Sequence, residues 1–183
     1  MSPLRRAILF DRDGVLNRRI PDGYVLDPQG FEWLPGARTA LRQATEAGLV
    51  CAVVTNQACI GRGLASAETI QAIHDRMVSE AFAAGGRIDG VFVCPHRPED
   101  GCDCRKPKPG LVYQAAQALG LDLSASLLIG DSPTDIQAAA TAGVPAIRVG
   151  PRPHVHAGAD SRAPTVGWAP DAAAAVARWL RDH

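Results

Sequence analysis

The sequence lacks three features that would assign it to particular classes of protein. It has no apolar run long enough to cross a membrane, and its basic N-terminus leads into only four apolar residues before Asp11, fewer than a signal peptide needs. Lys and Arg together number 19, as do Asp and Glu, so the net charge is zero and no general basic surface awaits nucleic acid. We therefore expect a cytoplasmic protein with neither a membrane nor a nucleic acid as partner.

The length and composition fit one globular domain. The chain has 183 residues, of which 46% are hydrophobic and 21% are charged, the balance of an ordinary globular protein. We expect a single domain over residues 1–183, with little room for a second.

Short apolar runs alternate with segments of helical spacing along most of the chain. The runs are typical of buried strands and cover residues 7–10, 49–54, 90–93, 127–129 and 146–149. The helical segments cover residues 36–47, 66–84, 111–119, 134–142 and the Ala-rich stretch 170–180. This order predicts an α/β protein, a Rossmann-like parallel sheet between two helical layers. A loop or small hairpin is expected over 14–35, an irregular segment over 94–110 and a surface connection over 150–169.

Polar residues follow three of the predicted strands. Asp11 follows the first, Thr55 the second and Asp131 the fourth. The carboxyl ends of parallel strands line one crevice, so these side chains should meet there. Asp11 and Asp13 are two residues apart and face the same way in extended chain, a pair that a magnesium ion would stabilise. Asp131 could supply a further ligand, assisted by Asp135; the alternative is that these aspartates only form turns and helix starts.

This set of residues suits phosphoryl transfer. Asp11 could attack phosphorus and form an aspartyl phosphate, while Asp13 protonates the leaving oxygen and later activates water. Lys106 or Lys108, with the Thr55 hydroxyl, could neutralise the charge on the phosphoryl oxygens.

The same residues carry a resemblance to a known family. Asp-Arg-Asp-Gly-Val-Leu-Asn (11–17), Val-Thr-Asn (54–56), Arg-Lys-Pro (105–107) and Gly-Asp-Ser-Pro-Thr-Asp (130–135) resemble the four motifs of the haloacid dehalogenase (HAD) superfamily, in the family's order. The resemblance implies Asp11 as nucleophile, Asp13 as acid and base, Thr55 and Lys106 as phosphate ligands, and magnesium held by Asp11, Asp13 and Asp131.

A loop rich in cysteine predicts a second metal. Cys94, His96, Cys102 and Cys104 are four ligands of the kind that zinc prefers, in a segment without the apolar periodicity of a core element. All four positions would be filled by protein, so we expect a structural zinc that aims Arg105 and Lys106 at the active site.

Within the superfamily, this loop, Thr-Asn-Gln (55–57), Gly-Arg-Gly (61–63) and residues 104–110 resemble the D-glycero-D-manno-heptose-1,7-bisphosphate 7-phosphatases and the related histidinol-phosphate phosphatases. The resemblance implies a small phosphorylated metabolite as substrate, no large cap domain and, with the small size, a monomer. Asn17, Asn56, Arg62, Arg105 and Lys106 are the expected substrate-binding residues, with the two arginines on the distal phosphate. One departure is Ala58-Cys59, where the heptose enzymes commonly have Ser-Gly.

Three alternatives remain open from the sequence. The substrate could be histidinol phosphate or another small sugar phosphate, and the chain could instead be a non-catalytic zinc-containing binding module. Cys51 is predicted to be a core residue and His74 a surface or packing residue, and nothing beside Cys59 indicates a reactive thiol.

Overall fold

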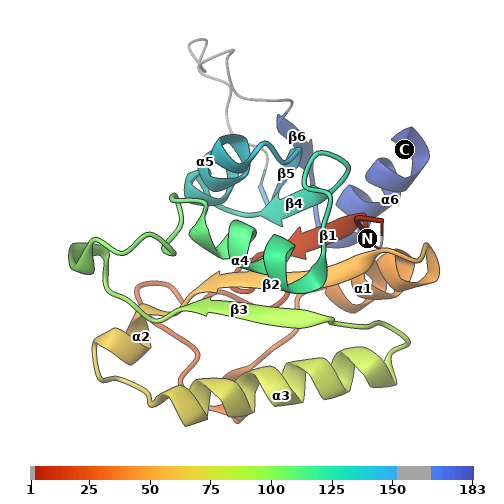
Figure 1. Cartoon of the computed structure of the whole chain (residues 1–183). Coiled ribbons are helices and arrows are strands. Elements are labelled where there is room, and N and C mark those ends of the chain that lie inside the picture. The colour runs from red at the N-terminus through yellow and green to blue at the C-terminus, as the bar shows by residue number, and fades with distance from the viewer. Residues whose placement is uncertain (1–2, 152–165) are drawn as a thin grey trace.

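A single parallel sheet carries all the strands of the described chain. The computed structural model describes residues 3–151 and 166–183. Its strands are β1 (Ala7–Phe10), β2 (Val50–Asn56), β3 (Gly90–Cys94), β4 (Leu127–Gly130), β5 (Ala146–Val149) and β6 (Val166–Ala169). They pair in the order β3-β2-β1-β4-β5-β6, every pair parallel, which confirms the predicted parallel sheet. The arrowheads of β1 to β4 in Figure 1 point to the same side of the molecule.

The helices follow the predicted segments closely. They are α1 (Ala37–Glu46), α2 (Ala58–Gly61), α3 (Ala67–Ala83), α4 (Gly110–Leu119), α5 (Pro133–Ala142) and α6 (Ala172–Asp182), with 3-10 turns η1 (Pro28–Gly30) and η2 (Pro98–Asp100). Ser66 caps α3, since its hydroxyl accepts a hydrogen bond from the Thr69 amide at 3.1 Å. Gly143 ends α5 with φ of 72°, a left-handed conformation that favours glycine.

The two faces of the sheet bury separate hydrophobic clusters. On one face Ile8, Phe10 and Ile129 pack with side chains of α1, α3 and α6. On the other face Leu9, Val54 and Leu128 pack with side chains of α4 and α5. Successive strand residues point to opposite faces, so both faces of these strands are apolar and helices cover each one. The predicted three-layer arrangement is therefore confirmed.

Two elements differ from the sequence-based expectation. Residues 166–169, predicted to belong to a surface connection, form the edge strand β6 instead; the rest of that segment, 152–165, lies outside the described residues. The strand was missed because Val-Gly-Trp-Ala has a glycine in its middle and one β-branched residue, and so lacks a continuous apolar run. The short helix α2 was also not predicted. Residues 14–35 contain only η1 and isolated bridges such as Asn17 to Trp33, as expected for a loop with a small hairpin.

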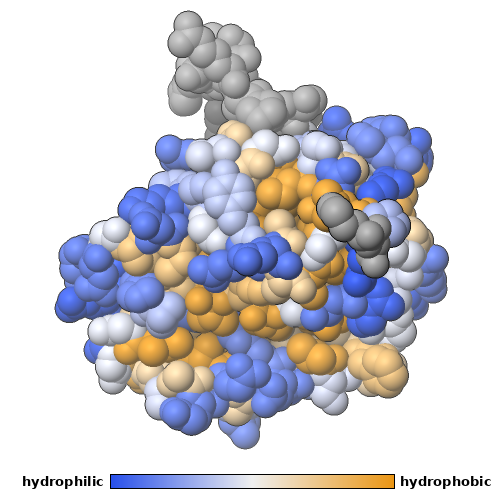
Figure 2. Space-filling model, in the orientation of Figure 1, coloured by the Kyte–Doolittle hydropathy of each residue, from blue (hydrophilic) through white to orange (hydrophobic). Residues whose placement is uncertain are grey.

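Among the described residues, no helix is both long and apolar enough to cross a membrane. The exposed large hydrophobic residues come from separate segments: Leu4, Ile20, Leu26, Leu64, Phe82 and Tyr113. On the face of the molecule drawn in Figure 2, hydrophobic residues alternate with hydrophilic ones.

Candidate active site

The residues predicted to follow the strands meet at the carboxyl edge of the sheet. Strand β1 lies between β2 and β4, with Phe10 opposite both Val53 and Ile129, so Asp11, Thr55 and Asp131 emerge side by side. They border a cavity of about 590 Å³. The residues lining it are Asp11, Asp13, Arg19, Ile20, Asp22, Gly23, Tyr24, Thr55, Asn56, Arg62, Arg105, Lys106, Asp131, Ser132, Thr134 and Asp135.

Lys106 is the cation at the centre of this site. Its Nζ lies 2.7 Å from Asp11 Oδ1 and 2.5 Å from Asp135 Oδ1, and it donates to the Val54 carbonyl at 2.8 Å. Burial opposes the charge, but the two carboxylates outweigh it and raise the pKa of Lys106. Lys108, the other candidate, extends to Asp103 on the surface instead.

Asn56 holds the main chain of Lys106 on both sides. Its side-chain amide donates to the Lys106 carbonyl at 3.0 Å, and its side-chain oxygen accepts from the Lys106 amide at 3.1 Å. Asn56 was predicted to bind substrate; it lines the cavity, and its amide is already used to fix the lysine.

Three carboxylates gather around the lysine. Oxygens of Asp11, Asp131 and Asp135 lie within 4.8 Å of one another, and with Lys106 the group carries three negative charges and one positive, which leave −2. Burial raises the pKa of Asp11 to about 7, against the effect of Lys106, and burial and the Asp135 charge also raise the pKa of Asp131. Oxygen donors and a net charge of −2 fit a magnesium ion.

Two glycines allow the carboxylates to come this close. A Cβ added to Gly14, whose φ is +91°, would lie 2.1 Å from Asp131 Oδ2, and one added to Gly130 would lie 2.2 Å from Asp135 Cβ. Any side chain at either position would displace a carboxylate of the cluster.

Asp13, predicted to hold magnesium with Asp11 and Asp131, has its side chain outside this group of three carboxylates. Its Oδ1 accepts from Arg12 and from Asn17, both at 3.0 Å, and its Oδ2 accepts from Gln57 at 2.7 Å. Although burial opposes ionisation, the Arg12 charge and these hydrogen bonds lower the pKa of Asp13. Asp135 occupies the position in the cluster that the sequence had assigned to Asp13.

The side chain of Asn17 contacts Asp13 and lies away from the cavity lining. It was predicted to bind substrate, yet it is fully buried and does not line the cavity. Its side-chain amide donates to Asp13 and to the Arg18 carbonyl at 2.9 Å, so it orients a carboxylate instead.

Arginines stand around the cavity as predicted from the sequence, with one addition. Arg62 and Arg105 line it, and Arg105 also donates to the His96 carbonyl at 3.1 Å. Arg19, which was not predicted, lines it too and lies 3.3 Å from Asp131 Oδ2. Ala58 and Cys59 are buried and absent from the lining, so this departure from the family pattern does not face the cavity.

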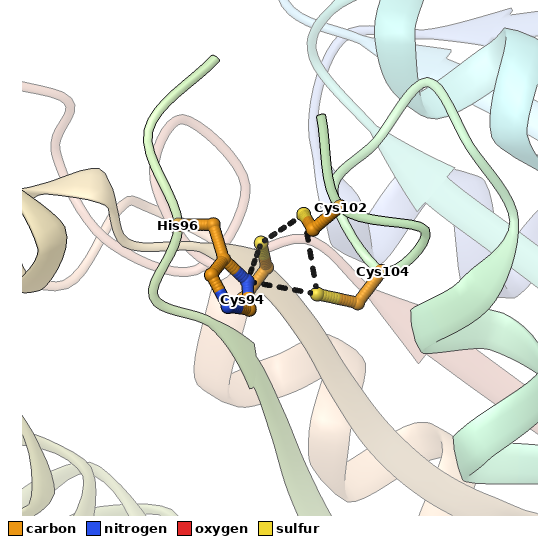
Figure 3. A group of neighbouring side chains, drawn as sticks. All are labelled: Cys94, His96, Cys102 and Cys104. Atoms are coloured by element: carbon orange, nitrogen blue, oxygen red, sulfur yellow. Dashed lines mark hydrogen bonds between the residues drawn. The ribbon is translucent and has the colours of Figure 1, made fainter. Parts of the chain in front are cut away.

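The four predicted zinc ligands converge at one point (Figure 3). Cys94 Sγ lies 3.6 Å from Cys102 Sγ and 3.7 Å from His96 Nδ1, while Cys104 Sγ lies 3.5 Å from Cys102 Sγ and 3.3 Å from His96 Nδ1. A tetrahedron of thiolates at the usual zinc–sulfur distance of about 2.3 Å has edges of about 3.8 Å. The donor set and its spacing fit a tetrahedral zinc ion.

This cysteine loop is attached to the cavity wall. The Gln57 amide donates to the Cys94 carbonyl at 2.8 Å, and the Gly61 amide donates to the Pro95 carbonyl at 2.9 Å. A Cβ on Gly61 would lie 2.7 Å from that carbonyl oxygen. The loop therefore joins α2 on one side and leads directly into Lys106 on the other.

Sequence reasoning missed the polar residues beneath Asp13. Gln57 is buried and also donates to the Thr55 hydroxyl at 2.9 Å, while Arg12 is buried and contacts His74 at 3.1 Å. Their position next to Asp13 and Thr55 in the motifs was a signal, but their partners lie too far along the chain to be read from spacing.

The chain is similar in sequence to known hydrolases. The HAD-hydrolase-like family model matches residues 103–177. The D-glycero-beta-D-manno-heptose-1,7-bisphosphate 7-phosphatase of Bordetella bronchiseptica is 42% identical over 138 residues, 75% of this chain and 76% of that protein. The D-glycero-alpha-D-manno-heptose-1,7-bisphosphate 7-phosphatase of Burkholderia mallei is 44% identical over 146 residues, 76% of each chain.

A solved structure agrees over nearly the whole length. The crystal structure of D,D-heptose 1,7-bisphosphate phosphatase from B. bronchiseptica, complexed with magnesium and phosphate, superimposes with a TM-score of 0.85 at 34% identity and covers 97% of this chain and 99% of that one. The fold, the motifs at the strand ends and these identities agree. The chain belongs to the D-glycero-D-manno-heptose-1,7-bisphosphate 7-phosphatases, a family of HAD-type phosphoric monoester hydrolases.

Proposed function

We propose that this chain hydrolyses the 7-phosphate of D-glycero-D-manno-heptose 1,7-bisphosphate through an aspartyl-phosphate intermediate. The observation that carries the proposal is the contact of Asp11 with Lys106, 2.7 Å apart at the wall of a cavity that arginines also line. This contact supports a role for Asp11 as nucleophile, because a buried cation beside the carboxylate can stabilise the charge of a phosphoryl group. The named relatives supply the substrate class.

The reaction would proceed in two displacements. Asp11 attacks phosphorus, so that a carboxylate oxygen–phosphorus bond forms while the bond from phosphorus to the sugar oxygen breaks. Asp13 gives a proton to that oxygen; its lowered pKa makes the acid form a stronger proton donor and favours the carboxylate that results. In the second step Asp13 takes a proton from water as the water oxygen bonds to phosphorus. The acyl-phosphate bond then breaks, and Asp11, inorganic phosphate and protonated Asp13 result.

The residues around Asp11 support the charge on phosphorus. Lys106 and the Thr55 hydroxyl would contact the phosphoryl oxygens, and Asn56 keeps the lysine main chain in place. Asp11 and Asp131, with Asp135 beside them, would hold magnesium, which supplies positive charge to the phosphoryl oxygens when it is bound.

The second phosphate of the substrate needs separate cations. Arg62 and Arg105 line the same cavity, and a guanidinium can bind a phosphate through two parallel hydrogen bonds. We propose that these two arginines bind the phosphate that is not removed. The zinc ion held by Cys94, His96, Cys102 and Cys104 would be structural and would fix the loop that carries Arg105.

The test is phosphate release in the presence of magnesium from both anomers of heptose 1,7-bisphosphate, histidinol phosphate, fructose 1,6-bisphosphate and a 3′-phosphorylated oligonucleotide. A preference for heptose bisphosphate with one phosphate released per molecule supports the proposal, and a preference for another substrate overturns the substrate assignment. Asp11→Asn should abolish turnover while the zinc content stays unchanged. Turnover that persists in Asp11→Asn would remove Asp11 as nucleophile.

The relatives carry names for both anomers, the beta anomer for the B. bronchiseptica protein and the alpha anomer for that of B. mallei, so the same panel assigns the anomer here. The cytoplasmic location and the monomeric state stay predictions from the sequence. Light scattering after size-exclusion chromatography tests the second.

A further inference from the structure

Arg12 is a buried charge with few partners. Its side chain is completely inaccessible, one arm of its guanidinium donates to Asp13 Oδ1 at 3.0 Å, and the other contacts His74 Nε2 at 3.1 Å. Its Nε has no hydrogen-bond partner among the residues that the structure describes. The orientation of the guanidinium therefore depends on one carboxylate and one imidazole.

The imidazole can only act as an acceptor here. A guanidinium has donors and no acceptor, so His74 Nε2 must accept and the ring proton resides on Nδ1. Burial and the neighbouring Arg12 charge lower the pKa of His74 to about 4, which keeps the ring neutral at ordinary pH. His74 comes from the middle of α3, 62 residues further along the chain, and is 1% exposed.

We propose that His74 is a positioning residue for Asp13 and acts on it through the Arg12 guanidinium. This inference rests on the proposed function, in which Asp13 is the acid and base. His74 itself contacts neither the cavity nor the carboxylate cluster.

The geometry explains why such a residue is needed. Asp13 must present one oxygen to the leaving group within a fraction of an ångström, and a side chain at the end of a strand has several rotamers available. Arg12 is its sequence neighbour and is itself a long side chain with several rotatable bonds. His74 fixes the far end of Arg12 from a separate helix, and the helix in turn packs on the sheet through Ile70, Ile73 and Met77.

Three variants separate positioning from core packing. His74→Leu keeps the volume but removes the acceptor, His74→Gln can offer its side-chain oxygen where Nε2 lies, and Met77→Leu changes the core of the same helix one turn away. His74→Leu should lower kcat at least about tenfold, a part of the contribution of acid–base catalysis, with KM unchanged. His74→Gln should recover most of that loss, and Met77→Leu should leave kcat unchanged.

A double-mutant cycle with Asp13→Asn measures the coupling between His74 and Asp13, which a purely structural role of His74 would not produce. If His74 acts through Asp13, His74→Leu should change the single-turnover rate less than twofold in the Asp13→Asn background. Losses that multiply, or a folded His74→Leu protein with wild-type kcat, would overturn the proposal.

Failure of the proposed function would be seen separately, in the substrate panel measured with the wild-type protein alone. The variants are compared with wild type on whichever substrate of the panel it hydrolyses. A further measurement needs no substrate: the ¹⁵N NMR signals of the Arg12 guanidinium should show slow rotation in wild type and faster rotation in His74→Leu. Equal rotation in the two proteins would also overturn the proposal.

Discussion

Lowering the pH should weaken the binding of magnesium to the carboxylate cluster. Burial raises the pKa of Asp11 to about 7, although Lys106 lies beside it. Magnesium binds the carboxylate and not the carboxylic acid, so below this pH each bound ion must displace a proton. The affinity should therefore rise with pH up to about 7 and level off above it.

The magnitude follows from that proton. One proton released per ion changes the dissociation constant about tenfold per pH unit, or about 1.4 kcal/mol. Half of Asp11 is already protonated at pH 7.0, so between pH 7.0 and 5.5 the affinity should fall about 16-fold, and between pH 7.5 and 8.5 it should barely change.

The same shift sets the sign of the effect on stability. The pKa of Asp11 in the folded protein lies above the ordinary value of 3.8, so the folded state binds this proton more tightly than the unfolded chain does. Without added magnesium, the contribution of Asp11 to the free energy of unfolding is greatest below about pH 4 and is lost as the pH rises to about 7. Saturating magnesium should offset this loss, because it binds the folded, ionised site.

Isothermal titration calorimetry between pH 5.5 and 8.0, in buffers of different ionisation enthalpy, measures both the affinity and the protons released. Asp11→Asn should bind magnesium more weakly and lose most of the pH dependence. Asp103→Asn, the control, removes a fully exposed charge and should leave the pH dependence of magnesium binding unchanged. Equal affinity at pH 5.5 and 8.0 in folded wild-type protein would refute the reasoning.

Further substitutions test other parts of the site. Cys102→Ser removes one of the four predicted zinc ligands and should lower the zinc content of the protein. The activity should fall with it, about 10- to 100-fold, and full activity in zinc-free protein would contradict this. Gly130→Ala would place a Cβ 2.2 Å from Asp135 Cβ and should destabilise the fold by about 3 kcal/mol; an unchanged melting temperature would exclude this steric conflict. Arg19→Ala removes a positive charge 3.3 Å from Asp131 and should raise the magnesium affinity a few-fold by calorimetry, a modest change since the arginine is exposed; weaker binding would show that the contact helps the ion.

The sequence predicted those parts of the site that depend on where strands end. Apolar runs located β1, β2 and β4, so the meeting of Asp11, Thr55 and Asp131 followed from the geometry of a parallel sheet. The zinc ligands were readable because their residue types and spacing lie within one short segment. The resemblance of residues 105–107 to the family's motif already favoured Lys106 over Lys108, and the structure adds its contacts with Asp11 and Asp135.

The remaining features depend on contacts between distant segments. Asp135 looked like an assisting residue one turn into a helix, and its ion pair with Lys106 appears only when that helix packs on the sheet. His74 was predicted to be a surface or packing residue, and its contact with Arg12 spans 62 residues. Asn17 is the last residue of the motif at 11–17, and its side chain turns inward to Asp13, an orientation that spacing does not reveal.

The attachment of α2 to the cysteine loop has a consequence for substrate length. Gly61 bonds to Pro95 and Arg105 bonds to His96, so the segments that carry Arg62 and Arg105 form one tied unit on one side of the cavity. Asp11 follows the end of β1, outside this tied unit. We expect the fixed distance between the tied unit and Asp11 to select bisphosphates by the separation of their two phosphates. A sugar bisphosphate with a shorter carbon chain would then place only one of its phosphates in its site.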